Sequence, residues 1–285
     1  MSTSRQRPLS SDQGVQGDGL YLPTIKAHSL EKLRRHDRYA SMFTTCSKHK
    51  WPQLAYIGLC CGAGRARVEG SGQVVETAAM SALRLPFTHY VFVDKSARCI
   101  GALKNRVTAA GTMASITLIQ GDVNTCIPRV KAALPRVGRG KPGLLSLCFV
   151  DPYNANVKFQ SIRDLSRFKM DFLILLALGY DVTRNLDRYR APGNTLIADL
   201  IDCPTWRDEF KQFDPTGRDI NRFILAKYDK AMKGLGHQPA EPHAVKATGM
   251  GVLLYYLVFY SKHALGNKLW KATLDGMSPQ MRLDV

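Results

Sequence analysis

One stretch of this 285-residue chain decides its fold: Leu54-Ala55-Tyr56-Ile57-Gly58-Leu59-Cys60-Cys61-Gly62-Ala63-Gly64-Arg65. The apolar run at residues 54–60 predicts a buried strand, and the glycines that follow it predict a tight loop. Glycine has no Cβ, so its backbone can approach a ligand closely at the end of a strand. A lone G-x-G pattern is equally compatible with a simple turn, so the loop needs support from the rest of the chain.

Strand and helix patterns alternate along the chain after this loop. The predicted strands are residues 89–93, 115–119, 144–150 and 171–176, and the helices between them are residues 96–110, a segment through Ile127 and Val130, and residues 159–168. Residues 144–150 form a nearly continuous apolar run, which is typical of a central parallel strand covered on both faces. This alternation predicts an α/β fold with a doubly wound, mostly parallel, seven-stranded sheet of the Rossmann-like type.

The last third of the chain departs from this alternation. Residues 179–219 contain several arginines and prolines, and they predict a partly helical insertion on the ligand side of the sheet. Residues 218–234 predict a helix, and strands 243–248 and 252–260, joined by Gly249-Met250-Gly251, predict a closing β-hairpin. We therefore divide the chain into a disordered polar tail (1–20), one domain (21–270) and a C-terminal tail (271–285).

The chain is strongly basic, with a formal net charge of +17. Such a surface favours anionic partners, and basic runs at residues 32–38 and 129–141 could contact the phosphates of a nucleic acid. The same charge is compatible with a soluble basic protein that binds no nucleic acid. Charge alone does not separate these alternatives.

Cysteines and apolar runs predict the cellular setting. The chain has seven cysteines, an odd number, and its sequence holds no C-x-x-C pair or Cys/His cluster with zinc spacing. We expect reduced thiols in a cytoplasmic protein and no metal site. The polar start lacks the apolar core of a signal peptide, and the longest apolar runs are too short for a membrane helix, so we expect no membrane partner.

Acidic residues follow the next two predicted strands. Asp94, with Lys95, closes the second strand, and Asp122, with Val123, follows the third. An acid in the first place can accept hydrogen bonds from ribose hydroxyls, and one in the second place can meet an adenine amino group. Each could instead be a helix cap. A nicotinamide cofactor is disfavoured, because Ala66-Arg67 stands where the last glycine of G-x-G-x-x-G would fall.

The fourth strand is followed by Asp151-Pro152-Tyr153-Asn154. Methylation of an exocyclic amine needs hydrogen-bond acceptors for the amino group and a flat side chain that stacks on the base. The Asp151 carboxylate and a carbonyl at the proline could accept, and Tyr153 could stack. The segment is similar to the D-P-P-Y or N-P-P-Y motif of nucleic-acid amino-methyltransferases, with one proline missing. The alternative is a strand-ending turn with a packed tyrosine.

These segments together resemble the three-Cys-motif partner protein (TcmP) family over roughly residues 28–270. The matching pieces are Lys50-Trp51, 54–57, Gly62-Ala63-Gly64-Arg65, 86–94, Gly121-Asp122-Val123-Asn124, 149–153, 254–257, Ser261-Lys262-His263 and Lys268-Leu269-Trp270. The chain departs from the family where Gly58 replaces an aspartate before the glycine loop. This aspartate could bind the methionine amino group of a cofactor.

The resemblance implies a class I methyltransferase-like protein of bacterial or phage origin that binds S-adenosylmethionine. It places the cofactor at Gly62, Ala63, Gly64, Arg65, Asp94, Lys95, Asp122 and Val123, and the acceptor amine of a nucleic acid or nucleotide at Asp151, Pro152, Tyr153 and Asn154. It also implies an alternative, a non-catalytic subunit for a three-Cys-motif protein that is likened to radical-S-adenosylmethionine proteins. A third interpretation is a phage or mobile-element factor that binds nucleic acid by charge alone.

Overall fold

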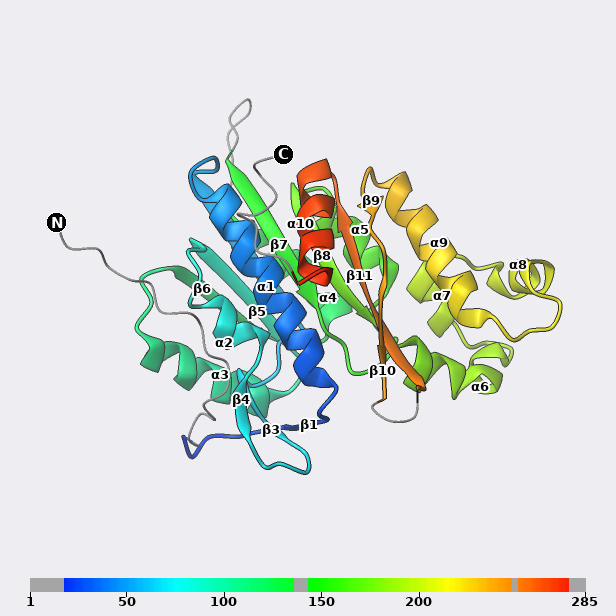
Figure 1. The fold of residues 1–285 in the computed structure, drawn as a ribbon, viewed down its shortest axis with the longest axis horizontal. Helices are drawn as coiled ribbons and strands as arrows, with labels where there is room; N and C mark the ends of the chain where they lie inside the picture. Colours follow the sequence, from blue (N-terminus) through cyan, green and yellow to red (C-terminus); the bar gives the residue numbers. More distant parts are fainter. Residues whose placement is uncertain (1–17, 136–142, 248–250, 277–285) are drawn as a thin grey trace.

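The centre of the fold is an open sheet of eight strands within the residues that the computed structural model describes, 18–135, 143–247 and 251–276 (Figure 1). Its strands are β2 (Gln53–Leu59), β5 (His89–Asp94), β6 (Ser115–Gln120), β7 (Leu144–Val150), β8 (Met170–Leu176), β9 (Gln238–Pro239), β10 (His243–Lys246) and β11 (Leu253–Ser261). The order across the sheet is β10-β11-β8-β7-β2-β5-β6, and β9 pairs with β11. Strands β2, β5, β6, β7 and β8 are parallel, whereas β11 is antiparallel to β8 and β10.

The strand order reverses between β2 and β7. The chain passes from β2 outward through β5 to β6, and then returns to β7 on the other side of β2. Leu59, at the end of β2, pairs with Val93 on one side and Val150 on the other. In open α/β sheets, ligands bind outside the carboxyl ends of the strands at such a reversal. A ligand site is therefore expected at this edge.

Helices cover both faces of the sheet. They are α1 (Ser29–Ser47), α2 (Ala78–Ala82), α3 (Ala97–Ala110), α4 (Val123–Ala133), α5 (Phe159–Leu165), the π-helix η1 (Leu178–Thr183), α6 (Leu186–Arg190), α7 (Leu196–Ile201), α8 (Trp206–Phe213), α9 (Ile220–Gly234) and α10 (Ala264–Leu274). Leu54 and Tyr56 of β2 pack with α1, α2 and α10, while Ala55, Ile57 and Leu59 face α4, α5, α7 and α9. Figure 1 shows α1 and α10 side by side on one face. The period-two side-chain alternation of a strand thus serves two cores.

The predicted fold class is confirmed. The sheet is mostly parallel, β7 has the predicted bounds, and Ser96 caps α3 by accepting a hydrogen bond from the Cys99 amide at 3.3 Å. The hairpin of β10 and β11 is antiparallel, although residues 248–250 of its turn lie outside the described residues. The short strand β9 joins the seven predicted strands.

A second, smaller sheet was not predicted. In the described part of the chain it has the order β1-β3-β4, with β1 at Thr24–Ile25, β3 at Arg65–Val68 and β4 at Val74–Glu76. The glycine loop therefore leads into a strand, and a helix begins only at Ala78. These strands have two to four residues each, too few for a hydrophobic period to be recognised.

The chain ends differ from the boundaries that we placed at residues 20 and 270. Arg106 donates from Nε and Nη2 to the two carboxylate oxygens of Asp18, at 2.7 and 2.8 Å, so residues 18–20 are attached to α3. Helix α10 continues to Leu274. The rest of both predicted tails, residues 1–17 and 277–285, lies outside the described residues, as do residues 136–142 of the second basic run. No helix of the described ranges is long and apolar enough to cross a membrane.

Candidate functional site

An open hollow of about 290 Å³ lies at the carboxyl ends of β2, β5, β6 and β7. Its lining residues are Cys60, Asp94, Lys95, Asp122, Val123, Asn124, Asp151, Tyr153, Asn154, Asn156 and Val157. Seven of the twelve residues predicted from the sequence are in this set: Asp94, Lys95, Asp122, Val123, Asp151, Tyr153 and Asn154. The structure thus brings together acids that are far apart in the chain, at the edge where the strand order reverses.

The four residues of the glycine loop lie beside this hollow and have different surroundings. Gly62 has a φ of +67°, and a Cβ there would meet nothing within 4 Å. Gly64 has a φ of +85°, but a Cβ there would lie 2.8 Å from Leu103 Cδ1 and 2.9 Å from Met80 Cγ. Gly62 therefore leaves open space for a ligand, whereas Gly64 allows α2 and α3 to pack closely.

The other two loop residues face the protein interior and the small sheet. Ala63 is buried, and its carbonyl accepts a hydrogen bond from Arg106 at 2.6 Å. The Arg65 guanidinium lies 3.1 Å from Asp18 and 3.7 Å from Glu76. Both residues have structural partners, and neither lines the hollow.

Asp94 and Asp122 line the hollow and also hold the local backbone. Asp94 accepts from the Gly62 amide at 2.8 Å and from the Ser96 amide at 2.9 Å, and Asp122 accepts from the Asn124 amide at 2.9 Å. Asp122 is the N-cap of α4, as the alternative interpretation of this residue predicted. A carboxylate has about four lone-pair sites, so these bonds leave acceptor capacity facing the hollow.

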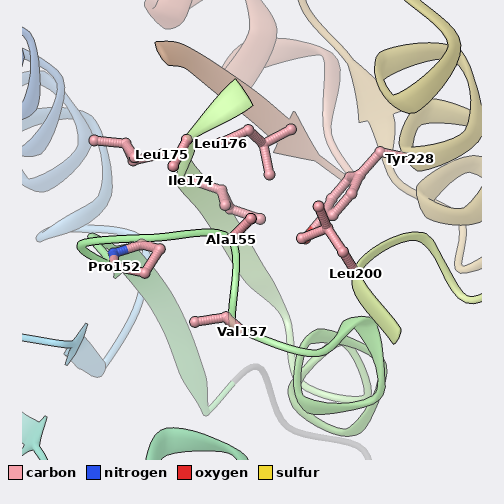
Figure 2. Close-up of a pocket in the computed structure, with 9 residues that line it drawn as sticks. Pro152, Ala155, Val157, Ile174, Leu175, Leu176, Leu200 and Tyr228 are labelled. Atoms are coloured by element: carbon pink, nitrogen blue, oxygen red, sulfur yellow. The ribbon is translucent and has the colours of Figure 1, made fainter. Parts of the chain in front are cut away.

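The loop that follows β7 alternates between buried and exposed side chains. Pro152, Ala155 and Val157 are buried, whereas Tyr153 is 89% exposed. Figure 2 shows the three buried residues turned towards a small apolar cavity that is lined also by Ile174, Leu176, Leu200 and Tyr228. Packing of Pro152, Ala155 and Val157 against this cavity therefore fixes the loop, and Tyr153 and Asn154 lie on the side of the hollow.

Asp151 has a partner that sequence reasoning missed. The Lys32 ammonium, from α1, donates to both carboxylate oxygens at 2.7 Å. The two side chains are only 13% and 21% exposed, so water screens this ion pair less than it screens a surface pair. Lys32 was expected to face solvent on a basic helix surface. No local sequence pattern indicates this ion pair, because 119 residues separate the two partners.

A second, smaller hollow adjoins the first and shares Cys60 and Asp151 with it. Gly58, Thr77, Ala78 and Phe149 are among its other lining residues. The Thr77 hydroxyl is buried and has no hydrogen-bond partner among the described residues. A Cβ at Gly58 would lie 3.0 Å from the ring of Phe92, so this position has little room for an acidic side chain. The small hollow thus places an unpaired buried hydroxyl in the same lining as Gly58.

Cys60 stands between the two hollows in a strained backbone conformation. Its φ is 61°, which is uncommon for a residue other than glycine. Burial raises the pKa of its thiol, and the nearby charges of Asp94, Asp151 and Asp122 raise it further. The thiol is therefore neutral at physiological pH and is a poor nucleophile. We assign Cys60 to the wall of the site.

Of the comparisons with known proteins, only the one with solved structures finds matches, and it supports the fold. No family model matches this chain, and no curated protein matches it. Among solved structures, protein LPL1258 from Legionella pneumophila str. Philadelphia 1, family-model DUF519, has a TM-score of 0.51 at 10% identity, covering 87% of this chain and 92% of that one. At this identity the likeness shows the fold alone.

Two solved methyltransferases are more loosely similar. The O-methyltransferase TomG from Streptomyces achromogenes, in complex with SAM, has a TM-score of 0.43 at 10% identity, covering 89% and 94% of the two chains. Magnesium protoporphyrin IX methyltransferase (ChlM) from Synechocystis PCC 6803, with bound SAH, has 0.41 at 11% identity, covering 86% and 90%.

Proposed function

We propose that this chain is an S-adenosylmethionine-dependent methyltransferase that acts on an amine of a nucleic acid or nucleotide. One observation carries the proposal: Asp94, Asp122 and Asp151, with the exposed Tyr153 ring, line a single hollow at the reversal of the strand order. The first two acids suit a nucleoside, and the third lies where an acceptor would enter.

The residues of the two hollows fit the cofactor. The larger hollow, at about 290 Å³, is at the lower end of the size range of sites for small molecules, and Asp94 and Asp122 retain acceptor capacity for ribose hydroxyls and an adenine amine. Gly62 leaves space at the entrance to the loop. At the methionine end, the unpaired Thr77 hydroxyl stands in place of the acid that Gly58 lacks.

The acceptor side suits a neutral, flat amine. S-adenosylmethionine would supply a methyl group on a positively charged sulfur. The lone pair of a neutral amine would bond to the methyl carbon as the carbon–sulfur bond breaks, leaving neutral S-adenosylhomocysteine, and the methylated nitrogen would then lose a proton. The Asp151 carboxylate accepts hydrogen bonds from the amino group, and the exposed Tyr153 ring stacks on the base. The Lys32 ammonium beside Asp151 repels a cationic amine, which favours an exocyclic base amine over a lysine side chain.

The charge of the chain supports an anionic substrate. The net charge is +17, and the Lys95 side chain, which lines the larger hollow, is 82% exposed. Lysines at such a position could neutralise the phosphates on either side of the acceptor base. Binding of RNA or DNA should then weaken steeply as salt is added.

Transfer of a labelled methyl group from S-adenosylmethionine to pools of RNA and DNA tests this function. We expect incorporation by the wild type that is lost in Asp151→Ala and retained in Asp187→Ala, a control at an exposed acid on α6. No incorporation into either pool, or equal incorporation by wild type and Asp151→Ala, would contradict the proposed mechanism.

A second candidate is a non-catalytic subunit of a three-Cys-motif protein. Two observations favour it: Lys32 already holds both oxygens of Asp151, and the Phe92 ring leaves little room for an acid at position 58. This candidate predicts that S-adenosylmethionine neither produces heat on titration nor raises the melting temperature at millimolar concentration. The first candidate predicts the reverse.

A further inference from the structure

The loop at residues 151–158, which carries the proposed acceptor residues, lies outside the regular strands and helices. Side chains of other elements therefore hold its backbone. On one side, the Asn124 side chain makes two bonds: its Nδ2 donates to the Asn156 carbonyl at 3.0 Å, and its Oδ1 accepts from the Lys158 backbone amide at 2.8 Å. On the other side, the partners are two consecutive residues of η1, Tyr180 and Asp181.

Asp181 holds the loop from within the protein. It is 7% exposed, and one of its carboxylate oxygens accepts from the Ala155 amide at 2.8 Å. The other oxygen accepts from the Tyr189 hydroxyl at 2.7 Å and from the Asn185 side-chain amide at 3.1 Å. No Lys, Arg or His of the described ranges forms an ion pair with it. This buried charge is thus stabilised by neutral donors alone.

An ionised carboxylate satisfies all three donors, because it accepts hydrogen bonds at both oxygens and donates none. The Tyr189 hydroxyl can also accept, but an asparagine in place of Asp181 would turn its NH2 group towards either the Ala155 amide or the Asn185 side-chain NH2. Two donors would then face each other in a buried place, which costs free energy. The buried carboxylate therefore links the loop to the insertion in a way that its isostere cannot.

Tyr180 holds the loop on the other side of Asn154. Its hydroxyl donates to the Tyr153 carbonyl at 2.5 Å, and the centroids of the two tyrosine rings are 6.4 Å apart. The Val182 amide bonds to the Ala177 carbonyl, the i→i+5 pattern of a π-helix. Such single turns occur often at functional sites. The side chains of Tyr180 and Asp181 thus bond to the Tyr153 carbonyl and the Ala155 amide, which are two residues apart in the loop.

We infer that Tyr180 and Asp181 are positioning residues that fix the loop at residues 151–158 in the conformation that presents Asp151 and Tyr153 to the acceptor amine. The inference rests on the proposed function for what the loop presents. How the loop is held depends only on the contacts described above.

The test compares three variants of the full chain: Asp181→Asn, Tyr180→Phe and the control Asp187→Asn, at an exposed acid on α6. Three quantities are measured for each: hydrogen exchange of the backbone amides by NMR, the dissociation constant of S-adenosylmethionine, and the kcat of methyl transfer to nucleic acid. Tyr180→Phe removes one hydroxyl from a partly exposed residue, so it keeps the test valid if Asp181→Asn does not fold.

We expect Asp181→Asn to speed exchange of the Ala155 amide by about tenfold or more, without a general loss of protection. The kcat should fall by about 100-fold in Asp181→Asn and by less in Tyr180→Phe, because a small misplacement of an acceptor group is costly. Cofactor affinity should stay within about twofold, since Tyr180 and Asp181 hydrogen-bond to the loop and not to Asp94 or Asp122.

Three results would overturn the inference: unchanged exchange at Ala155, faster exchange throughout the chain, or faster exchange at the loop with an unaltered kcat. If the wild type transfers no methyl group, the proposed function fails, and the exchange data still decide whether Asp181 holds the loop. Unchanged exchange in that case overturns the inference, and local acceleration supports the holding contact.

Discussion

The two halves of the carboxyl edge of the sheet are held in different ways. On the side of β5 and β6, Asp94 and Asp122 accept hydrogen bonds from backbone amides two residues further along the chain. On the side of β7 and β8, Asp151 is held by Lys32, 119 residues away, and Ala155 by Asp181, 26 residues away. After the proposed function, we call the side of β5 and β6 the cofactor half and the side of β7 and β8 the acceptor half.

This difference separates what substitutions in each half should do. In the cofactor half, Asp94 is fixed by the turn that follows β5 and by the Gly62 amide, so its loss should weaken ligand binding and leave the acceptor loop in place. In the acceptor half, the geometry depends on contacts between distant elements, so substitutions should alter methyl transfer and stability together. Four predictions follow the comparison from the largest effect to the smallest.

The largest effect should come from Asp151 in the acceptor half. Asp151→Ala removes the proposed acceptor of the amino group, and we expect the rate of methyl transfer to fall by about 100-fold to 1,000-fold. Asp151→Asn keeps one carbonyl oxygen and should lose about tenfold. Radiolabelled transfer assays measure both. Equal rates for the two variants would show that Asp151 does not act as an acceptor.

Alanine substitutions at Gly62 and Gly64 should differ in cost, because Gly62 borders open space and Gly64 packs against two helices. Gly64→Ala places a Cβ under 3 Å from Leu103 and Met80 at a positive φ, and should lower the free energy of unfolding by about 2–3 kcal/mol. Gly62→Ala meets open space and should cost only about 1 kcal/mol, from its positive φ. Urea unfolding compares them, and equal losses would contradict this division of roles.

An acid at the opposite, amino edge of the sheet should affect stability without affecting binding. Burial raises the pKa of Asp171 to about 6, although the hydroxyls of Ser261 and Tyr39 donate to it. Its folded pKa is above the unfolded value, so its contribution to stability is fully present below about pH 4 and is lost as the pH rises to about 6, by up to about 3 kcal/mol in total. The stability of the wild type relative to Asp171→Asn should therefore rise as the pH falls from 7 to 4. A constant difference across this range, in urea titrations, would contradict the raised pKa.

The smallest effect should distinguish two lysine–acid pairs. Lys32→Met leaves Asp151 partly buried without its partner, and should lower the free energy of unfolding by about 1–2 kcal/mol. Lys26→Met breaks an exposed pair with Glu69 and should cost under about 1 kcal/mol. Denaturant titrations of both variants test this. If Lys26→Met is the more costly, Asp151 does not depend on Lys32 for its setting.

The sequence predicted that Asp94 and Asp122 lie at neighbouring strand ends because the signals for their positions are local. The apolar run at residues 144–150 is β7 residue for residue, and Asp94 and Asp122 end up at neighbouring strand ends because parallel strands share a direction. The caps at Ser96 and Asp122 follow from side chains close to the amides that they bind. Short-range chemistry of this kind is readable from one sequence.

The sequence did not predict what holds the acceptor half. The contacts of Lys32 with Asp151 and of Tyr180 with Tyr153 depend on how α1 and η1 pack, which no local pattern encodes. The small sheet was missed for the same reason, since β1 at Thr24–Ile25 pairs with residues more than forty positions away. The roles of Gly62 and Gly64 also differ only because α2 and α3 fill the space beside Gly64.

Calorimetric titration of S-adenosylmethionine tests the central claim most directly. The account predicts saturable heat with the wild type and with Asp187→Ala. It also predicts affinity weaker by about tenfold or more for Asp94→Ala, because that variant loses charge-assisted hydrogen bonds to the ribose. Circular dichroism should show that Asp94→Ala remains folded although the Gly62 amide has lost its acceptor. Absence of heat and of any thermal shift with the wild type at millimolar cofactor would contradict the account.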